Sequence, residues 1–224
     1  MAGDDYGIRR LILASGSPRR RQLLSLMGVP FVVKAAEVDE SPLHGEPATE
    51  LVLRVSQVKA FSVFDVRPDE LVIAADTIVV LDGEVLGKPA DADDATRMLY
   101  DLRGRPHMVY TGVSVWHPAR RRMVCKLDES TVWMREYDGA EIAAYVASGD
   151  PMDKAGAYAI QHPEFAPASR VEKCWLNVMG LPICQLARAL SQFGFQVPSN
   201  VPGTCVAFSQ RDCAAYGEPM TPER

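Results

Sequence analysis

The sequence predicts an α/β fold, in which a mixed, twisted sheet is flanked by helices. Short apolar runs and helical patterns alternate over the first half of the chain, as they do where helices cover a sheet. The run LVIAADTIVVL at 71–81 is almost entirely apolar, which is typical of a strand covered on both faces. Two long strand patterns then follow each other at 107–116 and 122–134, which favours a sheet of mixed direction. The loops at the strand ends are expected to enclose a ligand cleft between two lobes or at a switch in strand order.

The first two elements lie on either side of a tight turn. An apolar strand is predicted over 8–14 and a helix over 18–27. Ser17 suits the N-cap of this helix, and Pro18 suits its first position because proline lacks the N–H that would be unpaired there.

A short strand and a long helix come next. The strand is predicted over 31–33, after a Gly-Val-Pro turn, and the helix over 48–64. One stripe of this helix follows helical spacing and consists of Val52, Val55, Lys59 and Val63.

Turn and capping residues predict the elements after the apolar strand. The dipeptide at 82–83 is Asp-Gly, a hairpin turn that leads to a short strand over 84–86. Asp91 suits the N-cap of a further helix, and Gly104 suits the position just past its end.

A capping box predicts a helix over 139–147. Asp138 and Glu141 have the required spacing, so this acidic pair is interpreted as structural rather than catalytic. Residues 150–170 are then predicted to form a long irregular segment, and such segments inside a compact domain are often functional.

The C-terminal part predicts one last helix and a tail. Residues 176–178 are expected to form a short strand, after which Gly-Leu-Pro at 180–182 opens a helix that Gly194 closes. The prediction is a single domain over 1–195 and a peripheral tail over 196–224, with one short helix around 209–215.

The composition excludes several classes of protein. The 224 residues carry a formal net charge of −5, which argues against a nucleic-acid polymer as partner. The five cysteines are odd in number and show no CxxC spacing, so reduced thiols in a cytoplasmic protein are expected. The first apolar run is too short for a signal peptide, and no stretch has the length of a membrane span, so no membrane partner is expected.

Three consecutive arginines stand at the start of the first predicted helix. Arg19, Arg20 and Arg21 fall in a helical turn where the macrodipole is already positive. A bound anion would restore the balance, held by free backbone N–H groups, guanidinium groups and the hydroxyls of Ser15 and Ser17. The alternative is a solvated basic helix start.

Asp76 interrupts the most apolar strand of the chain. A carboxylate buried there is costly unless it is paired or bound to a metal ion, which favours a functional site over a local turn cap. Thr77 follows it, and adjacent strand residues face opposite sides. Both side chains are therefore expected to reach one cleft only if the strand bends or ends there.

The roles of the further charged residues are ambiguous when each is taken alone, but together these residues indicate one kind of ligand. Lys59 could simply extend its amine to water, and Asp39 and Glu40 could be surface acids. Lys88 is presented by a rigid Gly-Lys-Pro loop. Together with the arginines, these cations suit a polyphosphate, while carboxylates suit Mg²⁺ or Mn²⁺. The sequence lacks the P-loop, the Rossmann GxGxxG, HExxH and GxSxG motifs.

At this point the chain resembles the Maf family of nucleoside triphosphate pyrophosphatases. The resemblance runs in order over about residues 8–193, and the ordered set is far more specific than any one piece. The matching motifs are LASGSPRR at 13–20, VDES at 38–41, KA at 59–60, AADTIV at 74–79, GKP at 87–89, TGV at 111–113, DKAGAYAIQ at 153–161 and NVMGLP at 177–182.

The resemblance implies a Maf/ITPase-like fold, a homodimer, and hydrolysis of a nucleoside triphosphate to monophosphate and pyrophosphate with Mg²⁺ or Mn²⁺. Asp76 is then the expected proton acceptor that activates water, and with Glu40 a metal ligand. Whether Asp76 mainly orients the water or accepts its proton stays open. The residues expected to select the nucleotide are Arg19, Thr77 and Gln161. Those expected to line the phosphate and metal site are Ser15, Arg20, Glu40, Lys59 and Lys88.

The loop at 153–161 looks like that of the dTTP/UTP branch of the family. After Gln161, however, the family usually continues Gly-Leu-Gly, whereas this chain has HPEFAP at 162–167. Another base preference, such as 7-methyl-GTP, therefore stays open, and His162 could touch substrate or be an ordinary loop histidine. Two other functions also stay open: a nucleotide-binding regulatory module without turnover, and an interaction protein that acts through its tail.

Overall fold

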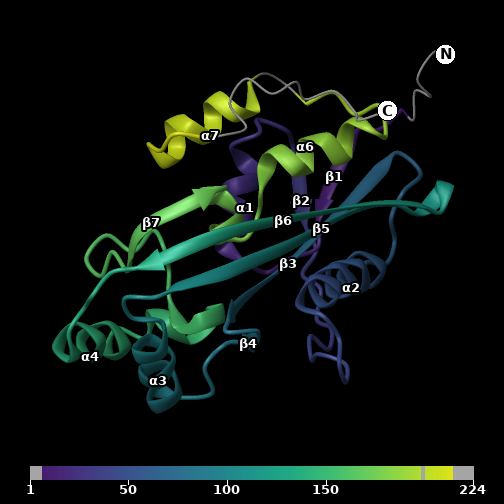
Figure 1. Ribbon diagram of the computed structural model, residues 1–224. Helices are drawn as coiled ribbons and strands as arrows, with labels where there is room; N and C mark the ends of the chain where they lie inside the picture. Colours follow the sequence, from purple (N-terminus) through teal and green to yellow (C-terminus); the bar gives the residue numbers. More distant parts are fainter. Residues whose placement is uncertain (1–6, 198–199, 214–224) are drawn as a thin grey trace.

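The computed structural model describes residues 7–197 and 200–213, which form one sheet surrounded by helices (Figure 1). Its strands are β1 Arg10–Leu13, β2 Phe31–Val33, β3 Glu70–Leu81, β4 Glu84–Leu86, β5 Pro106–His117, β6 Arg122–Met134 and β7 Ala168–Lys173. Its α-helices are α1 Pro18–Ser25, α2 Ala48–Phe61, α3 Ala92–Leu102, α4 Gly139–Ala147, α5 Trp175–Met179, α6 Ile183–Ser191 and α7 Val201–Ser209. Its 3₁₀ helices are η1 Pro118–Arg120, η2 Asp150–Asp153 and η3 Ala155–Ala157.

The predicted α/β class with a mixed sheet is confirmed. The strands pair in the order β2-β1-β3-β5-β6-β7, and β4 pairs with β3. β1 runs parallel to both β2 and β3, whereas β3, β4, β5, β6 and β7 pair antiparallel. Parallel neighbours need crossover helices, and α1 and α2 supply them.

One edge of β3 is left open in its middle. β1 pairs with β3 only as far as Ile73, and β4 begins to pair at Val79. Between these positions, no strand in the described part of the chain pairs with this edge, although β5 pairs continuously along the other edge. The sheet therefore contains a notch beside residues 74–78.

Helices cover both faces of the sheet, as the apolar pattern of β3 predicts. α2 packs on one face of β3, β5 and β6, and the larger core on the other face takes side chains from α1, α3, α5 and α6. Gly112 of β5 allows α2 to pack closely against the sheet. A Cβ at this position would lie 2.4 Å from the Val52 carbonyl oxygen, which is too close. This contact fixes the distance between α2 and the sheet beside the notch.

The predicted helix caps are confirmed. Ser17 caps α1 and Asp91 caps α3, each by accepting a hydrogen bond from the backbone N–H three residues on. Asp138 and Glu141 form the predicted capping box of α4. These acids are therefore structural, as interpreted from their spacing.

Two predictions between residues 150 and 180 were wrong or incomplete. Residues 176–178 lie in the short helix α5, because Cys174 caps its start and Gly180, at φ 107°, ends it. Three apolar residues are too few to distinguish helical from strand spacing. β7 was not predicted, since its sequence ASRVEK at an exposed sheet edge carries no apolar alternation.

The tail holds a helix at a different place from the one predicted. α7 begins after Asn200, whose side chain accepts a hydrogen bond from the Gly203 N–H, and it ends at Ser209. The prediction of a helix around 209–215 is therefore wrong for 210–213, while 214–215 lie outside the described residues. Val201 and Cys205 are buried against the larger core, where α7 contacts α5 and α6.

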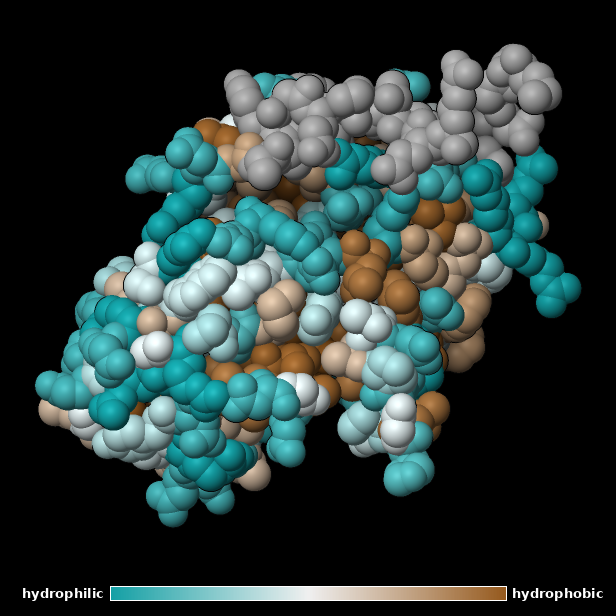
Figure 2. Space-filling model, in the orientation of Figure 1, coloured by the Kyte–Doolittle hydropathy of each residue, from teal (hydrophilic) through white to brown (hydrophobic). Residues whose placement is uncertain are grey.

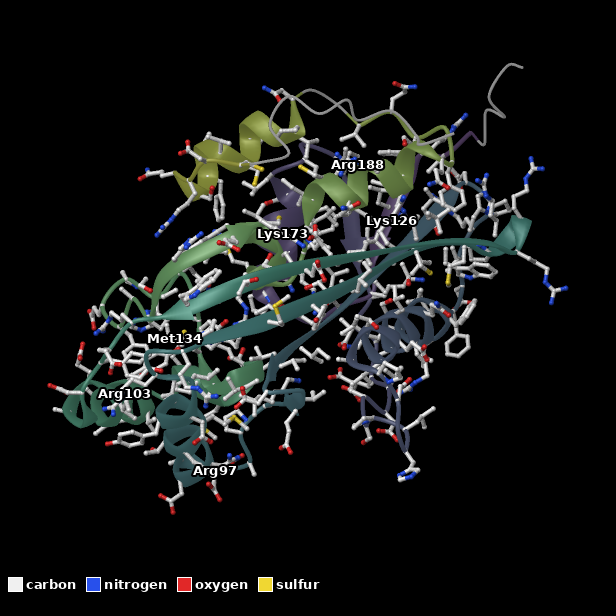
Figure 3. All side chains as sticks on the ribbon, in the orientation of Figure 1. Arg97, Arg103, Lys126, Met134, Lys173 and Arg188 are labelled. Carbon is white, nitrogen blue, oxygen red and sulfur yellow. The ribbon has the colours of Figure 1, made fainter. Side chains whose placement is uncertain are left out.

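Asp128 of β6 is expected to weaken the fold at neutral pH. Burial raises its pKa to about 6, although Lys173 and Arg188, labelled in Figure 3, act to lower it. Since this pKa lies above the unfolded value of about 3.9, the stability tied to protonated Asp128 is complete below about pH 4 and is lost as the pH rises through 6. Asp128→Asn should therefore raise the free energy of unfolding by about 2–3 kcal/mol at pH 8, and by much less near pH 4.

Denaturant unfolding at pH 4, 6 and 8 measures this difference. Asp101→Asn, which alters an exposed acid on α3, is the matched control and should change little at any pH. A gain from Asp128→Asn that is equal at all three pH values would contradict the burial argument.

Candidate active site

The notch in the sheet opens into a cleft of about 780 Å³. Figure 2 shows the surface hollowed at its lower edge, between β4 and the segment that precedes α2. Every residue that the sequence nominated for the site lines this cleft. They are Ser15, Arg19, Arg20, Glu40, Lys59, Asp76, Thr77, Lys88 and Gln161.

Asp76 and Thr77 both reach the cleft, although their side chains lie on opposite faces of β3. The strand neither bends away nor ends between them, since β5 pairs with both in regular register. The neighbouring strand β1 ends instead, which opens both faces of β3 to the same space. The expectation that β3 itself must bend or end was therefore wrong, because the end of the neighbouring strand is sufficient.

Lys59 joins two carboxylates on the α2 side of the cleft. Its Nζ lies 2.6 Å from Asp76 Oδ1 and 2.7 Å from Glu40 Oε1. Lys59 and Asp76 are each about 5% exposed, so this lysine does not extend to water as its helical stripe alone suggested. Separating such a buried pair would leave a buried charge without compensation, which is costly. The ion pair therefore holds these side chains in a fixed arrangement.

The charges around Glu40 favour its ionised form. Burial acts to raise its pKa, but the hydrogen bond and charge of Lys59, with the charges of Lys88 and Arg20, outweigh it and lower the pKa below the ordinary value. Glu40 is about half-exposed and lies on the segment before α2. It therefore faces the cleft as an anion held among cations.

Arg20 lies on the other face of β3, bound to neutral acceptors. Its Nε donates to the Gly180 carbonyl at 2.9 Å, and its Nη2 donates to Thr77 Oγ1 at 3.1 Å. Burial lowers its pKa, while the nearby charges of Asp76 and Glu40 partly offset that effect. A partly buried guanidinium that has no carboxylate in direct contact among the described residues is well suited to receive an anionic ligand.

The start of α1 supplies the other predicted basic residues. Arg19 Nη1 lies 3.6 Å from Asp153 Oδ2, across the cleft from its own helix. Arg21 is exposed and does not line the cleft, so it is a solvated neighbour of the site. Ser15 is buried and accepts a hydrogen bond from the Ser17 N–H.

Lys154 organises the irregular segment on the far wall, a role that the sequence did not reveal. Its buried amine binds the carboxylates of Asp150 and Asp153. The Gly156 N–H donates to the Gly87 carbonyl at 3.0 Å, which ties this segment to the loop that presents Lys88. The only sequence signal for Lys154 is its place in the DKAGAYAIQ motif.

His162 is an ordinary loop histidine. Its Nδ1 accepts a hydrogen bond from the Phe165 N–H at 3.0 Å, and its ring packs edge-on against Tyr145. It does not line the cleft, whereas Gln161 does. None of the residues of the unusual 162–167 stretch lines the cleft.

Glu40 and Asp76 are the candidate metal ligands. In the described part of the chain, no three His, Cys, Asp or Glu side chains gather closely enough to hold a metal ion. Mg²⁺ commonly binds one or two carboxylates and completes its shell with water and substrate phosphates. This donor set therefore fits a divalent cation that arrives with a polyphosphate.

A model of the family described as Maf-like protein matches residues 10–193. A dTTP/UTP pyrophosphatase of Pelotomaculum thermopropionicum is 45% identical over 190 residues, which cover 85% of this chain and 100% of that protein. A dTTP/UTP pyrophosphatase of an Anaeromyxobacter species is 49% identical over 197 residues, which cover 87% and 94% of the two chains. That of Geobacter metallireducens is 43% identical over 185 residues, which cover 83% and 96%.

Proposed function

This chain belongs to the Maf family, and we propose that it hydrolyses dTTP and UTP to the nucleoside monophosphate and pyrophosphate. It is a nucleoside triphosphate pyrophosphatase, a hydrolase of nucleotide metabolism. The structural observation that carries this conclusion is one buried carboxylate, Asp76, held by Lys59 in a cleft lined with further cations. The cations suit the triphosphate, and the carboxylate suits the activation of water.

Asp76 is proposed to position the attacking water and to take its proton. One of its oxygens is bound by Lys59, which leaves the other oxygen for the water. Attack at the α-phosphorus breaks the bond to the bridging oxygen, and pyrophosphate leaves with the electron pair of that bond. Arg20 and Lys88 offset the negative charge that develops on the leaving group.

Glu40 and Asp76 are proposed to bind Mg²⁺ or Mn²⁺ together with the substrate. When bound, the ion would withdraw negative charge from the phosphate oxygens. Lys59 holds the two carboxylates in place before substrate arrives, because its amine contacts both. Arg19, Thr77 and Gln161 are proposed to meet the nucleoside end, and Ser15 the phosphates.

A nucleotide panel with product analysis tests the proposal. The protein is incubated with dTTP, UTP, CTP, GTP and 7-methyl-GTP, in Mg²⁺ and in excess EDTA. The expected result is equal amounts of monophosphate and pyrophosphate, fastest from dTTP and UTP, and little product in EDTA. Release of single phosphates would contradict the reaction type, and a lack of product from every nucleotide would favour a binding module without turnover.

A homodimer in the cytoplasm is also proposed. Val58 and Phe61 at the end of α2 and Phe64 just after it are 39%, 51% and 78% exposed, and such apolar groups support contact with a second copy. The five cysteines carry free thiols, as suits a reducing compartment. Within the described ranges, none of the helices is long and apolar enough to cross a membrane. Sedimentation equilibrium measures the oligomeric state.

A further inference from the structure

Thr77 is the first member of a chain of hydroxyl groups that leads away from the cleft. Its Oγ1 lies 2.9 Å from Thr111 Oγ1 on β5. Thr111 Oγ1 in turn donates to the Asn177 carbonyl of α5 at 3.1 Å. Thr111 is fully buried, whereas Thr77 is partly exposed and lines the cleft.

The direction of each hydrogen bond in this chain can be deduced. A threonine hydroxyl has one hydrogen and two acceptor lone pairs. Thr111 gives its hydrogen to a carbonyl, which can only accept, so Thr111 must accept from Thr77. Thr77 therefore gives its hydrogen to Thr111 and accepts a hydrogen bond from Arg20 Nη2.

The rest of the network holds this direction in place. The Asn177 carbonyl also accepts from the Gly180 N–H at 2.9 Å, and the Gly180 carbonyl accepts from Arg20 Nε. The Asn177 side chain donates to the Val109 carbonyl and to Ser130 Oγ, both at 3.0 Å. The hydrogen bonds thus close a ring from Arg20 through Thr77, Thr111 and α5 back to Arg20.

Thr77 consequently presents only a lone pair to a ligand in the cleft. An ionised phosphate oxygen is also an acceptor, so this lone pair is unsuited to the phosphates and requires a donor from the nucleoside. Uracil and thymine carry an N–H at ring position 3, whereas cytosine has an unprotonated acceptor nitrogen there. A site built to pair with a hydrogen-bond donor discriminates against an analogue that lacks it.

We propose that Thr111 is a positioning residue for base selection: by accepting the hydrogen of Thr77, it makes Thr77 an acceptor that favours the N3–H of uracil and thymine over cytosine. This inference rests on the proposed function, since it assigns the base preference of the same cleft. Thr111 does not line the cleft, and it contacts a cleft-lining hydroxyl through Thr77.

Thr111→Val tests the inference, because valine keeps the shape and removes the acceptor. The Thr77 hydroxyl can then turn and donate to cytosine. The ratio of kcat/KM for UTP to that for CTP is expected to fall about tenfold, the effect of one hydrogen bond of ordinary strength. Thr111→Ser keeps the hydroxyl and should restore the ratio. Thr131→Val is the matched control and should leave the ratio unchanged. Among the described residues, the Thr131 hydroxyl has Met108 Sδ, at 3.5 Å, as its one hydrogen-bond partner.

A measurement on the unaltered protein covers the case in which Thr111→Val does not fold. 3-Methyl-UTP lacks the N3–H, whereas 5-methyl-UTP carries a methyl group of the same size and keeps it. We expect 5-methyl-UTP to be hydrolysed and 3-methyl-UTP to be hydrolysed at least tenfold less efficiently. Equal use of the two analogues would overturn the inference.

A folded Thr111→Val protein with an unchanged ratio would also overturn it. If that unchanged ratio came with an equal loss for UTP and CTP, a sugar hydroxyl rather than the base would be placed at Thr77. Failure of the proposed function is distinct from these results, because it would appear as an absence of pyrophosphate release from UTP by the unaltered protein.

Discussion

Asp76→Asn should lose nearly all pyrophosphate release and keep its fold. Loss of a positioned general base typically lowers kcat by about 10²–10⁴-fold. The fold should survive because Lys59 keeps its contact with Glu40 at 2.7 Å, so its charge is still compensated. Steady-state release of pyrophosphate from UTP, with nucleotide binding measured separately by calorimetry, gives kcat and affinity independently.

Asp101→Asn is the matched control for this substitution, since it makes the same chemical change on an exposed turn of α3. It should hydrolyse UTP at the rate of the unaltered protein. If Asp76→Asn also did so, Asp76 would not be the group that activates water.

Lys59→Met is expected to lower both stability and activity. It removes the amine that lies 2.6 Å from Asp76 and leaves that carboxylate buried without a counter-charge. Loss of one partner from a buried ion pair typically costs about 3–5 kcal/mol of unfolding free energy. Denaturant unfolding at pH 7 measures the loss, and UTP hydrolysis should fall with it because Asp76 and Glu40 are no longer held together.

The double variant Lys59→Met with Asp76→Asn separates the two effects. Both charges are then absent, so most of the lost stability should return, while activity should not. A double variant as unstable as Lys59→Met alone would show that lysine packing, rather than the ion pair, stabilises this wall of the cleft.

The local elements were predictable because neighbouring residues determine them. Ser17 before Pro18 marks the start of α1, and Asp138 with Glu141 marks the start of α4, since a cap bonds to backbone only three residues away. The apolar run of β3 predicts a strand for the same reason, because it can be recognised without knowing which strands pair with it. β7 was missed and α5 was misassigned, because their short sequences carry no clear periodicity. β7 is defined by its pairing with β6, and α5 by its ends at Cys174 and Gly180.

The candidate site was predictable as a set of residues but not as an arrangement. The nine nominated residues line one cleft, and their roles stay predictions until the variants are measured. Lys59 alone resembled a lysine that extends to water, and only the packing of α2 on β3 brings it to Asp76. Lys154, Thr111 and Asn177 received no role, because each bonds to groups whose positions the sequence does not specify.

The sequence by itself therefore determined most of the elements, the order of the motifs and the chemistry that those side chains can perform. The tertiary structure alone decided that β1 pairs with β3 only as far as Ile73 and that β4 begins to pair at Val79, which opens the notch through which Asp76 and Thr77 share one cleft. It also decided the direction of the hydrogen bond from Thr77 to Thr111. The physical reason is range: caps and turns form between near neighbours, whereas strand register, helix packing and hydrogen-bond rings join residues that only the folded chain brings together.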